Sequence, residues 1–315
     1  MFFAVFFLVL FFQIQFSYVV EILSNSTISF LILALALSTL GNMFCATRWK
    51  KIFYIFSSDN LKIPFIKLYF ESISASTVLP GGVLSADIFR TVRGSFYISN
   101  ISEKKLIAFN KNITLSVFFD RIHGLWTLCI LAILAFLFEF FFQFQFSSES
   151  IHSFSIFNIV KNSIFFQFYI LFLFFIIALP IFKNLLKINF LKKFTKKYYN
   201  NPKKIEIFKE KKIFYTSLFS QFLFATSYFF CLWSIGVFVP LTICFFFVPG
   251  IFLFAALPLS IAGFGPREAG ALIFLMTLNL DYEQILASSI LFGIIATIQG
   301  LCFLIINLIF SKKHS

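Results

Sequence analysis

One segment of the chain places an arginine and a glutamate side by side within an apolar region. It contains Gly263-Phe264-Gly265-Pro266-Arg267-Glu268 and follows a long apolar run. A charged side chain at the centre of a bilayer costs roughly 3 kcal/mol on insertion scales and more in simulations, so such residues indicate function. Arg267 and Glu268 are therefore the first candidates for a binding site.

The residue types around this pair indicate anion binding. Pro266 suits the first position of a helix, and Gly263 and Gly265 let a backbone or a ligand approach closely. Glu268 is favoured in the first turn by the helix dipole, whereas Arg267 needs an anion there. That anion is either a lipid phosphate, or an internal carboxylate such as Glu71 or Asp87 that would lock two parts of the protein together.

A second break in the apolar sequence carries its own charged residues. Pro80, Gly81 and Gly82 are followed by Asp87 and Arg90, which are three residues apart and can pair on one helical face. A helix that begins after Gly82 would present a positive end to a phosphate. Alternatively the glycines only permit a tight turn, and Asp87, Arg90 and Arg93 are anchors at the membrane interface.

A third group lies at Asp120-Arg121, with His123 and Gly124 close behind. Neighbours on a helix point about 100° apart, so we expect Asp120 and Arg121 to pair with other residues. His123 has no companion at metal-ligand spacing and is interpreted as an interfacial hydrogen-bonding residue. The sequence holds no catalytic triad, metal cluster or nucleotide-binding loop, so we expect neither an enzyme nor a cofactor.

Composition indicates what positions these residues. Hydrophobic residues make up 60% of the 315, charged residues only 12%, and the mean hydropathy is +0.93. The hydrophobic fraction is higher and the charged fraction lower than in soluble domains, which predicts an all-α polytopic membrane protein formed by a single transmembrane domain, 1–315. The five cysteines lie in apolar runs without CxxC spacing, so we interpret them as core residues.

About six apolar runs have the length of a full span. They are 2–20, 28–47, 117–140, 163–182, 213–238 and 285–309. Two further regions, 63–89 and 240–280, are apolar but interrupted by Pro and Gly, which end helices. We expect each of these two to form a re-entrant helical hairpin.

Basic residues then predict the topology. Nearly all of the 26 Lys and Arg residues lie in 48–67, 90–111, the tail and the 183–212 loop, which holds eleven lysines. Basic loops are cytoplasmic, so the 63–89 hairpin enters from inside, the 240–280 hairpin enters from outside, and both termini are cytoplasmic. The halves 1–142 and 163–315 then form inverted repeats, typical of transporters. The alternative is eight ordinary spans with proline kinks.

These motifs resemble those of the transmembrane region of lysylphosphatidylglycerol synthases and its flippase-like stand-alone relatives. The resemblance covers most of the chain. Its most specific part is Pro258-Leu259-Ser260-Ile261 with the segment from Gly263 to Glu268. The other parts are Leu79-Pro80-Gly81-Gly82 with Asp87 and Arg90, and Asp120-Arg121 before Gly124. Ser85 and Ala86 stand where the family often has glycine, and Pro266 replaces a usually aliphatic residue.

The resemblance implies a protein of the bacterial-type inner membrane that translocates a lipid without synthesising lysylphosphatidylglycerol, since no synthase domain is expected. Its partner would be an anionic phospholipid or a polyprenyl-linked lipid, and no nucleic acid. The residues expected to contact the substrate are Pro80, Gly81, Gly82, Asp87, Arg90, Asp120, Arg121, Gly263, Gly265, Arg267 and Glu268. Two alternatives stay open: a membrane enzyme acting on a lipid headgroup, and an accessory scaffold for a glycosyltransferase or synthase.

Overall fold

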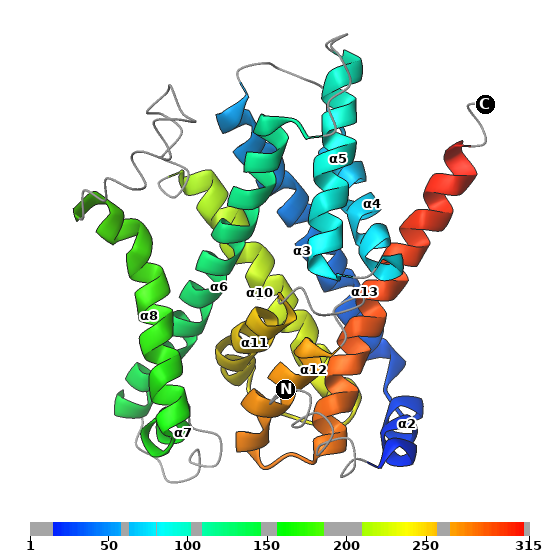
Figure 1. The fold of residues 1–315 in the computed structure, drawn as a ribbon. Coiled ribbons are helices and arrows are strands. Elements are labelled where there is room, and N and C mark those ends of the chain that lie inside the picture. The colour runs from blue at the N-terminus through cyan, green and yellow to red at the C-terminus, as the bar shows by residue number, and fades with distance from the viewer. Residues whose placement is uncertain are drawn as a thin grey trace, which may run out of the picture.

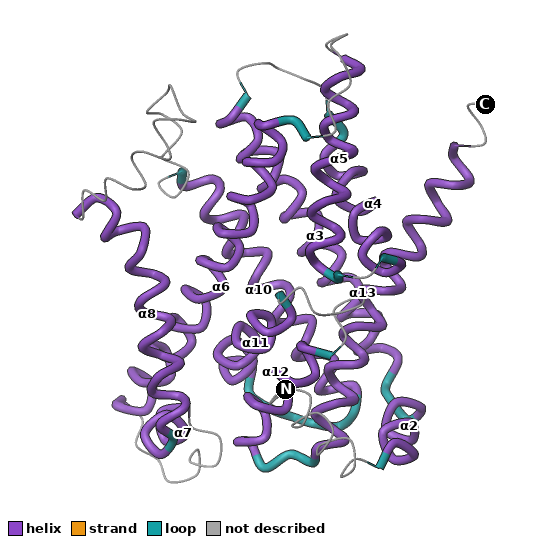
Figure 2. Tube along the Cα trace, viewed as in Figure 1, coloured by secondary structure: helices purple, strands orange, loops and turns teal. Residues whose placement is uncertain are grey.

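All the regular secondary structure in the described part of the chain is helical (Figure 2). The computed structural model describes residues 15–57, 63–79, 81–101, 109–145, 156–185, 210–256 and 265–311. The α-helices are α2 (Phe16–Ser24), α3 (Ile28–Phe56), α4 (Phe65–Val78), α5 (Val83–Ile101), α6 (Lys111–Gln145), α7 (Ile156–Asn162), α8 (Ile164–Leu185), α10 (Lys211–Ser234), α11 (Leu241–Ala255), α12 (Pro266–Leu275) and α13 (Tyr282–Ser311), with a 3-10 turn, η3 (Met276–Leu278). The predicted all-α class is confirmed for these residues.

Within the part of the chain that the structure describes, three helices are long and apolar enough to cross a membrane. They are α3, the part of α6 from Lys111 to Phe141, and the part of α13 from Tyr282 to Asn307. Large apolar side chains are exposed on these helices and on α8, for example Phe138, Phe168 and Ile305. A surface of this kind suits contact with lipid better than contact with water. The structure therefore fits a membrane protein, and the number of six full spans stays a prediction.

Two predicted segments can be compared with the structure only in part. The apolar run 2–20 lies mostly outside the described residues, and its end belongs to the short helix α2. The basic loop 183–212 also lies almost entirely outside them. Helix α3 extends to Phe56, beyond the predicted limit of 47, because Trp49, Ile52 and Phe53 continue its buried face.

The two predicted breaks separate pairs of helices that pack on each other. Helix α4 packs against α5, and α11 packs against α12. Gly81 and Gly82 turn the chain between the first pair with φ angles of 100° and 51°, values that favour glycine. Gly265 precedes α12 with φ of 103°, and Pro266 is the first residue of that helix. Helix α5 continues to Ile101, beyond the predicted hairpin limit of 89.

Helices α3 and α10 form the central pair of the molecule, and they run antiparallel. The backbone N–H of Thr27, before α3, donates to the carbonyl of Ser234 at the end of α10 (2.8 Å). At the opposite ends, Lys51 donates to the carbonyl of Lys212 (3.3 Å). Ser227 of α10 also donates to the carbonyl of Ala34 (2.8 Å). The two helices are thus linked along most of their length.

The other packing partners fall into matching sets around this pair. Helix α4 packs on α13, and the corresponding contact in the second set is α11 on α6. Likewise α5 packs on α6, and the corresponding contact is α12 on α13. In the same way α3 contacts α4, α6 and α13, while α10 contacts α11, α13 and α6. Exchanging α3, α4, α5 and α6 for α10, α11, α12 and α13 therefore reproduces these contacts.

The hairpins approach the middle of the molecule from opposite ends. Figure 1 shows α5 and α12 beginning near the middle, with their remaining lengths running toward opposite ends. At the end where α5 finishes lie the end of α3 and the starts of α6 and α10, together with the ends of α8 and α13 (Figure 1). The helix that carries Asp87 and Arg90 and the helix that carries Arg267 and Glu268 therefore both begin in the interior.

Candidate functional site

Five charged residues from α3, α5 and α6 form one buried network, which we call the α5–α6 charge cluster. Its members are Arg48, Asp87, Arg90, Asp120 and Arg121. Asp120 accepts from Arg48 Nε at 2.7 Å and from Arg90 Nη1 at 3.1 Å. Asp87 accepts from Arg90 Nη2 at 2.5 Å and from Arg121 Nη2 at 2.7 Å. The cluster therefore joins the first hairpin to the long helix after it.

Arg90 has no exposed surface, like Asp120. Its guanidinium lies between two aromatic rings, 5.0 Å from the centre of Trp49 and 5.1 Å from that of Tyr69. Arginine stacks well on aromatic faces because its charge is delocalised over a plane. Burial therefore excludes the interpretation of Arg90 as an interfacial anchor, whereas the side chain of Arg93 is half exposed.

Arg48 belongs to the cluster, although it falls in the basic segment 48–67 that was expected to lie in the cytoplasm. It lies inside α3 with 3% of its surface exposed, and its Nη1 also donates to Ser217 Oγ of α10 (2.9 Å). Gly124 of α6 makes room for it, because a Cβ atom at that position would lie 3.3 Å from both terminal nitrogens of Arg48. A sequence signal was present, since Arg48 falls among the buried residues Cys45, Trp49 and Ile52 on one face of α3.

The cluster carries a net positive charge, since three guanidinium groups face two carboxylates. Buried charges are tolerated when they are paired and hydrogen-bonded, and Asp87 and Asp120 are. Arg121 is the most accessible of the three cations, with 36% of its side chain exposed. This excess charge favours an anion close to the start of α5.

The second candidate group lies at the start of α12, and its charged side chains bond mainly to each other and to close neighbours. Arg267 Nη2 donates to Glu268 Oε1 at 2.8 Å, and Ser289 Oγ of α13 donates to the same oxygen at 3.0 Å. Glu268 Oε2 accepts from the backbone N–H of Gly265 at 2.5 Å. Arg267 and Glu268 are 4% and 8% exposed. We call Gly265, Arg267, Glu268 and Ser289 the α12 site.

The internal counter-ion of Arg267 is thus its own neighbour. Among the described residues, the predicted alternative partners pair with other cations: Asp87 with Arg90 and Arg121, and Glu71 with Lys67 and Arg93, each 3.9 Å away. A ring of α13, Phe292, lies 6.0 Å from the Arg267 guanidinium. The pair is neutral overall, so the arginine has a carboxylate partner that another anion would have to replace.

The remaining predicted site residues are placed only in part. Gly81 and Gly82 form the turn before α5, whereas Pro80 and Gly263 lie outside the described residues. The structure brings Asp87, Arg90, Asp120 and Arg121 into one cluster and Gly265, Arg267 and Glu268 into another. His123 is buried with its ring 5.6 Å from that of Trp126. In the described ranges no group of three or more His, Cys, Asp or Glu residues could hold a metal ion.

Comparison with known proteins identifies one family. The model of the lysylphosphatidylglycerol synthase TM region matches residues 1–303 of the chain. No curated protein and no solved structure matches the chain. The matched region contains every residue of the α5–α6 charge cluster and of the α12 site, and it ends within α13.

Proposed function

The chain belongs to the family of the lysylphosphatidylglycerol synthase TM region, and from this we propose that it moves a lipid or lipid-linked molecule across the membrane. The family gives the chain a membrane setting and a role connected with lipids. The step to transport is supported by the arrangement of the helices and by the charges at the starts of α5 and α12.

The matching sets of helix contacts carry this proposal. Helices α3 to α6 and α10 to α13 make corresponding contacts, and each set contains one hairpin with a glycine-containing break. Inverted repeats with broken helices are the arrangement in which transporters bind substrate near the middle of the membrane. We therefore propose that the two sets are inverted halves that move relative to each other, with the antiparallel α3 and α10 between them.

The charge distribution supports an orientation. The ends of α3, α5, α8 and α13 and the starts of α6 and α10 share one end of the molecule (Figure 1), and the basic segments of the sequence adjoin them. Because basic residues concentrate on the cytoplasmic side, we propose that this end faces the cytoplasm. The α4–α5 hairpin would then enter from the cytoplasm and the α11–α12 hairpin from the other side, in a bacterial-type inner membrane.

An anionic headgroup fits the two clusters. Helices α5 and α12 both begin in the interior, and the positive end of a helix dipole favours a phosphate. Arg121 and Arg267 are the cations next to these starts. We propose that the phosphate of a phospholipid or of a polyprenyl-linked lipid binds between the hairpins and displaces Glu268 from Arg267.

Reconstitution tests this proposal. The purified protein would be placed in vesicles that contain a fluorescent phosphatidylglycerol, and movement between leaflets would be followed by quenching with a membrane-impermeant reductant. We expect faster exchange than in protein-free vesicles, and loss of that gain in Arg267→Ala. The control is Lys111→Ala, which removes an exposed cation at the start of α6. Equal rates with and without protein, for phosphatidylglycerol and for a polyprenyl phosphate, would overturn the proposal.

A further inference from the structure

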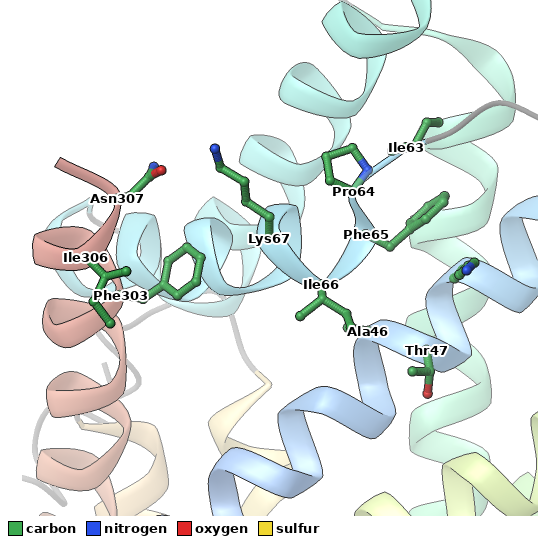
Figure 3. Close-up of a pocket in the computed structure, with 11 residues that line it drawn as sticks. Ala46, Thr47, Ile63, Pro64, Phe65, Ile66, Lys67, Phe303, Ile306 and Asn307 are labelled. Carbon is green, nitrogen blue, oxygen red and sulfur yellow. The ribbon is translucent and has the colours of Figure 1, made fainter. Parts of the chain in front are cut away.

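A groove lies between α3, α4 and α13, and its lining includes no residue of the α5–α6 charge cluster or of the α12 site. We call it the α3–α4–α13 groove; its volume is about 640 Å³, and Lys50, Ile66, Lys67, Phe303, Ile306 and Asn307 are among the residues that line it. Figure 3 shows Phe303 and Ile306 of α13 on one side and Ile66 of α4 on the other. This volume lies within the range of roughly 300–1,000 Å³ that is usual for ligand sites.

The groove is apolar along its walls and basic along its edge. Ile66 and Ile306 are each 49% exposed, so their side chains remain available to a ligand. Lys50 is exposed, and the side chain of Lys67 is 48% exposed. Side chains on a helix lean toward its N-terminus, so Lys67 leans toward Pro64 at the start of α4. Figure 3 shows Lys67 and Asn307 pointing out of the groove in a similar direction.

One carboxylate lies near Lys67 and is already engaged. Glu71 is 5% exposed, accepts from Asn307 Nδ2 at 3.0 Å, and lies 3.9 Å from both Lys67 and Arg93. A ligand in the groove therefore meets exposed ammonium groups and a buried, shared carboxylate. The local field favours an anion.

A second cavity extends the groove around α4. It has a volume of about 380 Å³, is lined by Glu71, Val78, Arg93 and Leu304, and shares Phe303 and Asn307 with the first. The two cavities thus meet at α13 and offer apolar surface on both sides of one polar position. This shape suits a molecule with more than one apolar chain joined to an anionic group.

We infer that the α3–α4–α13 groove binds an anionic phospholipid, with its phosphate between Lys50 and Lys67 and an acyl chain along Ile66, Phe303 and Ile306. Basic pockets between transmembrane helices on the cytoplasmic side are a recurrent way of holding anionic headgroups. This lipid site is separate from the α12 site, and it does not depend on transport between leaflets.

Lipid titration followed by native mass spectrometry tests the inference on the full-length protein. The probes are phosphatidylglycerol and phosphatidylcholine with the same acyl chains. We expect tighter binding of phosphatidylglycerol, weakened roughly 5-fold by Lys50→Ala or Lys67→Ala and roughly 25-fold by both, because each basic residue contributes about 1 kcal/mol. The matched control is Lys51→Ala, since Lys51 faces α10 and donates to the Lys212 carbonyl at 3.3 Å; its binding should equal that of the wild type.

A steric pair of variants tests the acyl-chain position. Ile306→Trp fills the groove and should weaken phosphatidylglycerol binding, whereas Ile309→Trp, one turn along α13, should not; Ile309 is 60% exposed and outside the groove. The Lys50→Ala and Lys67→Ala variants would also be measured in an Arg267→Ala background. This separates the effect of losing the α12 site from the effect of losing the groove. Equal binding of the two lipids, or equal binding by the double lysine variant and Lys51→Ala, would overturn the inference.

Discussion

Arg90 and Asp120 meet in the interior of the protein, where Arg90 Nη1 lies 3.1 Å from Asp120 Oδ2 and neither residue has exposed surface. They come from α5 and α6, on either side of a connection whose residues 102–108 are not described. Asp120 also accepts from Arg48 of α3. Asp120 therefore pairs with arginines from two other helices, α3 and α5.

Asp120→Asn should strongly destabilise the protein. The amide leaves two buried guanidinium groups without their shared negative charge, and breaking a buried pair typically costs about 3–5 kcal/mol. The free energy of unfolding in mixed micelles would be measured by tryptophan fluorescence. Asp281→Asn is the control because Asp281 is exposed, and it should change stability little. A similar small change in Asp120→Asn would contradict the assigned pairing.

Glu268→Gln should reduce both stability and lipid movement. The glutamine can still accept from the Gly265 N–H, but Arg267 loses its charged partner. Combining it with Arg267→Met should recover most of the stability, because replacing a buried pair by uncharged groups is often neutral. Lipid movement should be lost in the double variant, because it has no arginine at position 267. Recovery of movement together with stability would show that Arg267 has only a structural role.

Gly250→Ala should separate the two helices of the second hairpin. A Cβ atom at this position of α11 would lie 2.2 Å from Cζ of Phe274 in α12, far inside van der Waals contact. Overpacking of this kind typically costs about 1–3 kcal/mol. The melting temperature should fall, and Phe274→Leu in the same chain should restore part of it. If the alanine alone leaves the melting temperature unchanged, the close packing of α11 on α12 is wrong.

Single cysteines test the proposed orientation. In a Cys302→Ser background, which removes the exposed native thiol, Lys111→Cys should be protected in intact cells from a membrane-impermeant thiol reagent. Asp281→Cys, at the start of α13 and the opposite end of the molecule, should react (Figure 1). Permeabilised cells should label both positions. The reverse pattern in intact cells would invert the topology.

Local sequence features were sufficient to predict some of the site. Asp87 and Arg90 were expected to pair because three residues bring side chains to one helical face, and they do so at 2.5 Å. Asp120 and Arg121 were expected to have separate partners, which they have. The two glycine- and proline-containing breaks also separate helices as expected, because their backbone angles and missing donors end helices.

The partners from distant parts of the chain could not be predicted. Arg48 lies 72 residues before Asp120, and only the packing of α3 on α6 brings them together. Its basic character led to a loop assignment, whereas the longer helix places it in the interior. Similarly, adjacent helical residues point apart, yet Arg267 reaches Glu268 because its side chain is long enough to turn back at the start of α12.

Glu268 accepts hydrogen bonds from two groups besides Arg267. Its Oε2 accepts from the Gly265 N–H at 2.5 Å and its Oε1 from Ser289 at 3.0 Å, in addition to the guanidinium. If a competing anion takes the guanidinium, the carboxylate still keeps these two neutral donors. The arginine can thus exchange one counter-ion for another while the carboxylate stays in place and the first turn of α12 keeps its shape.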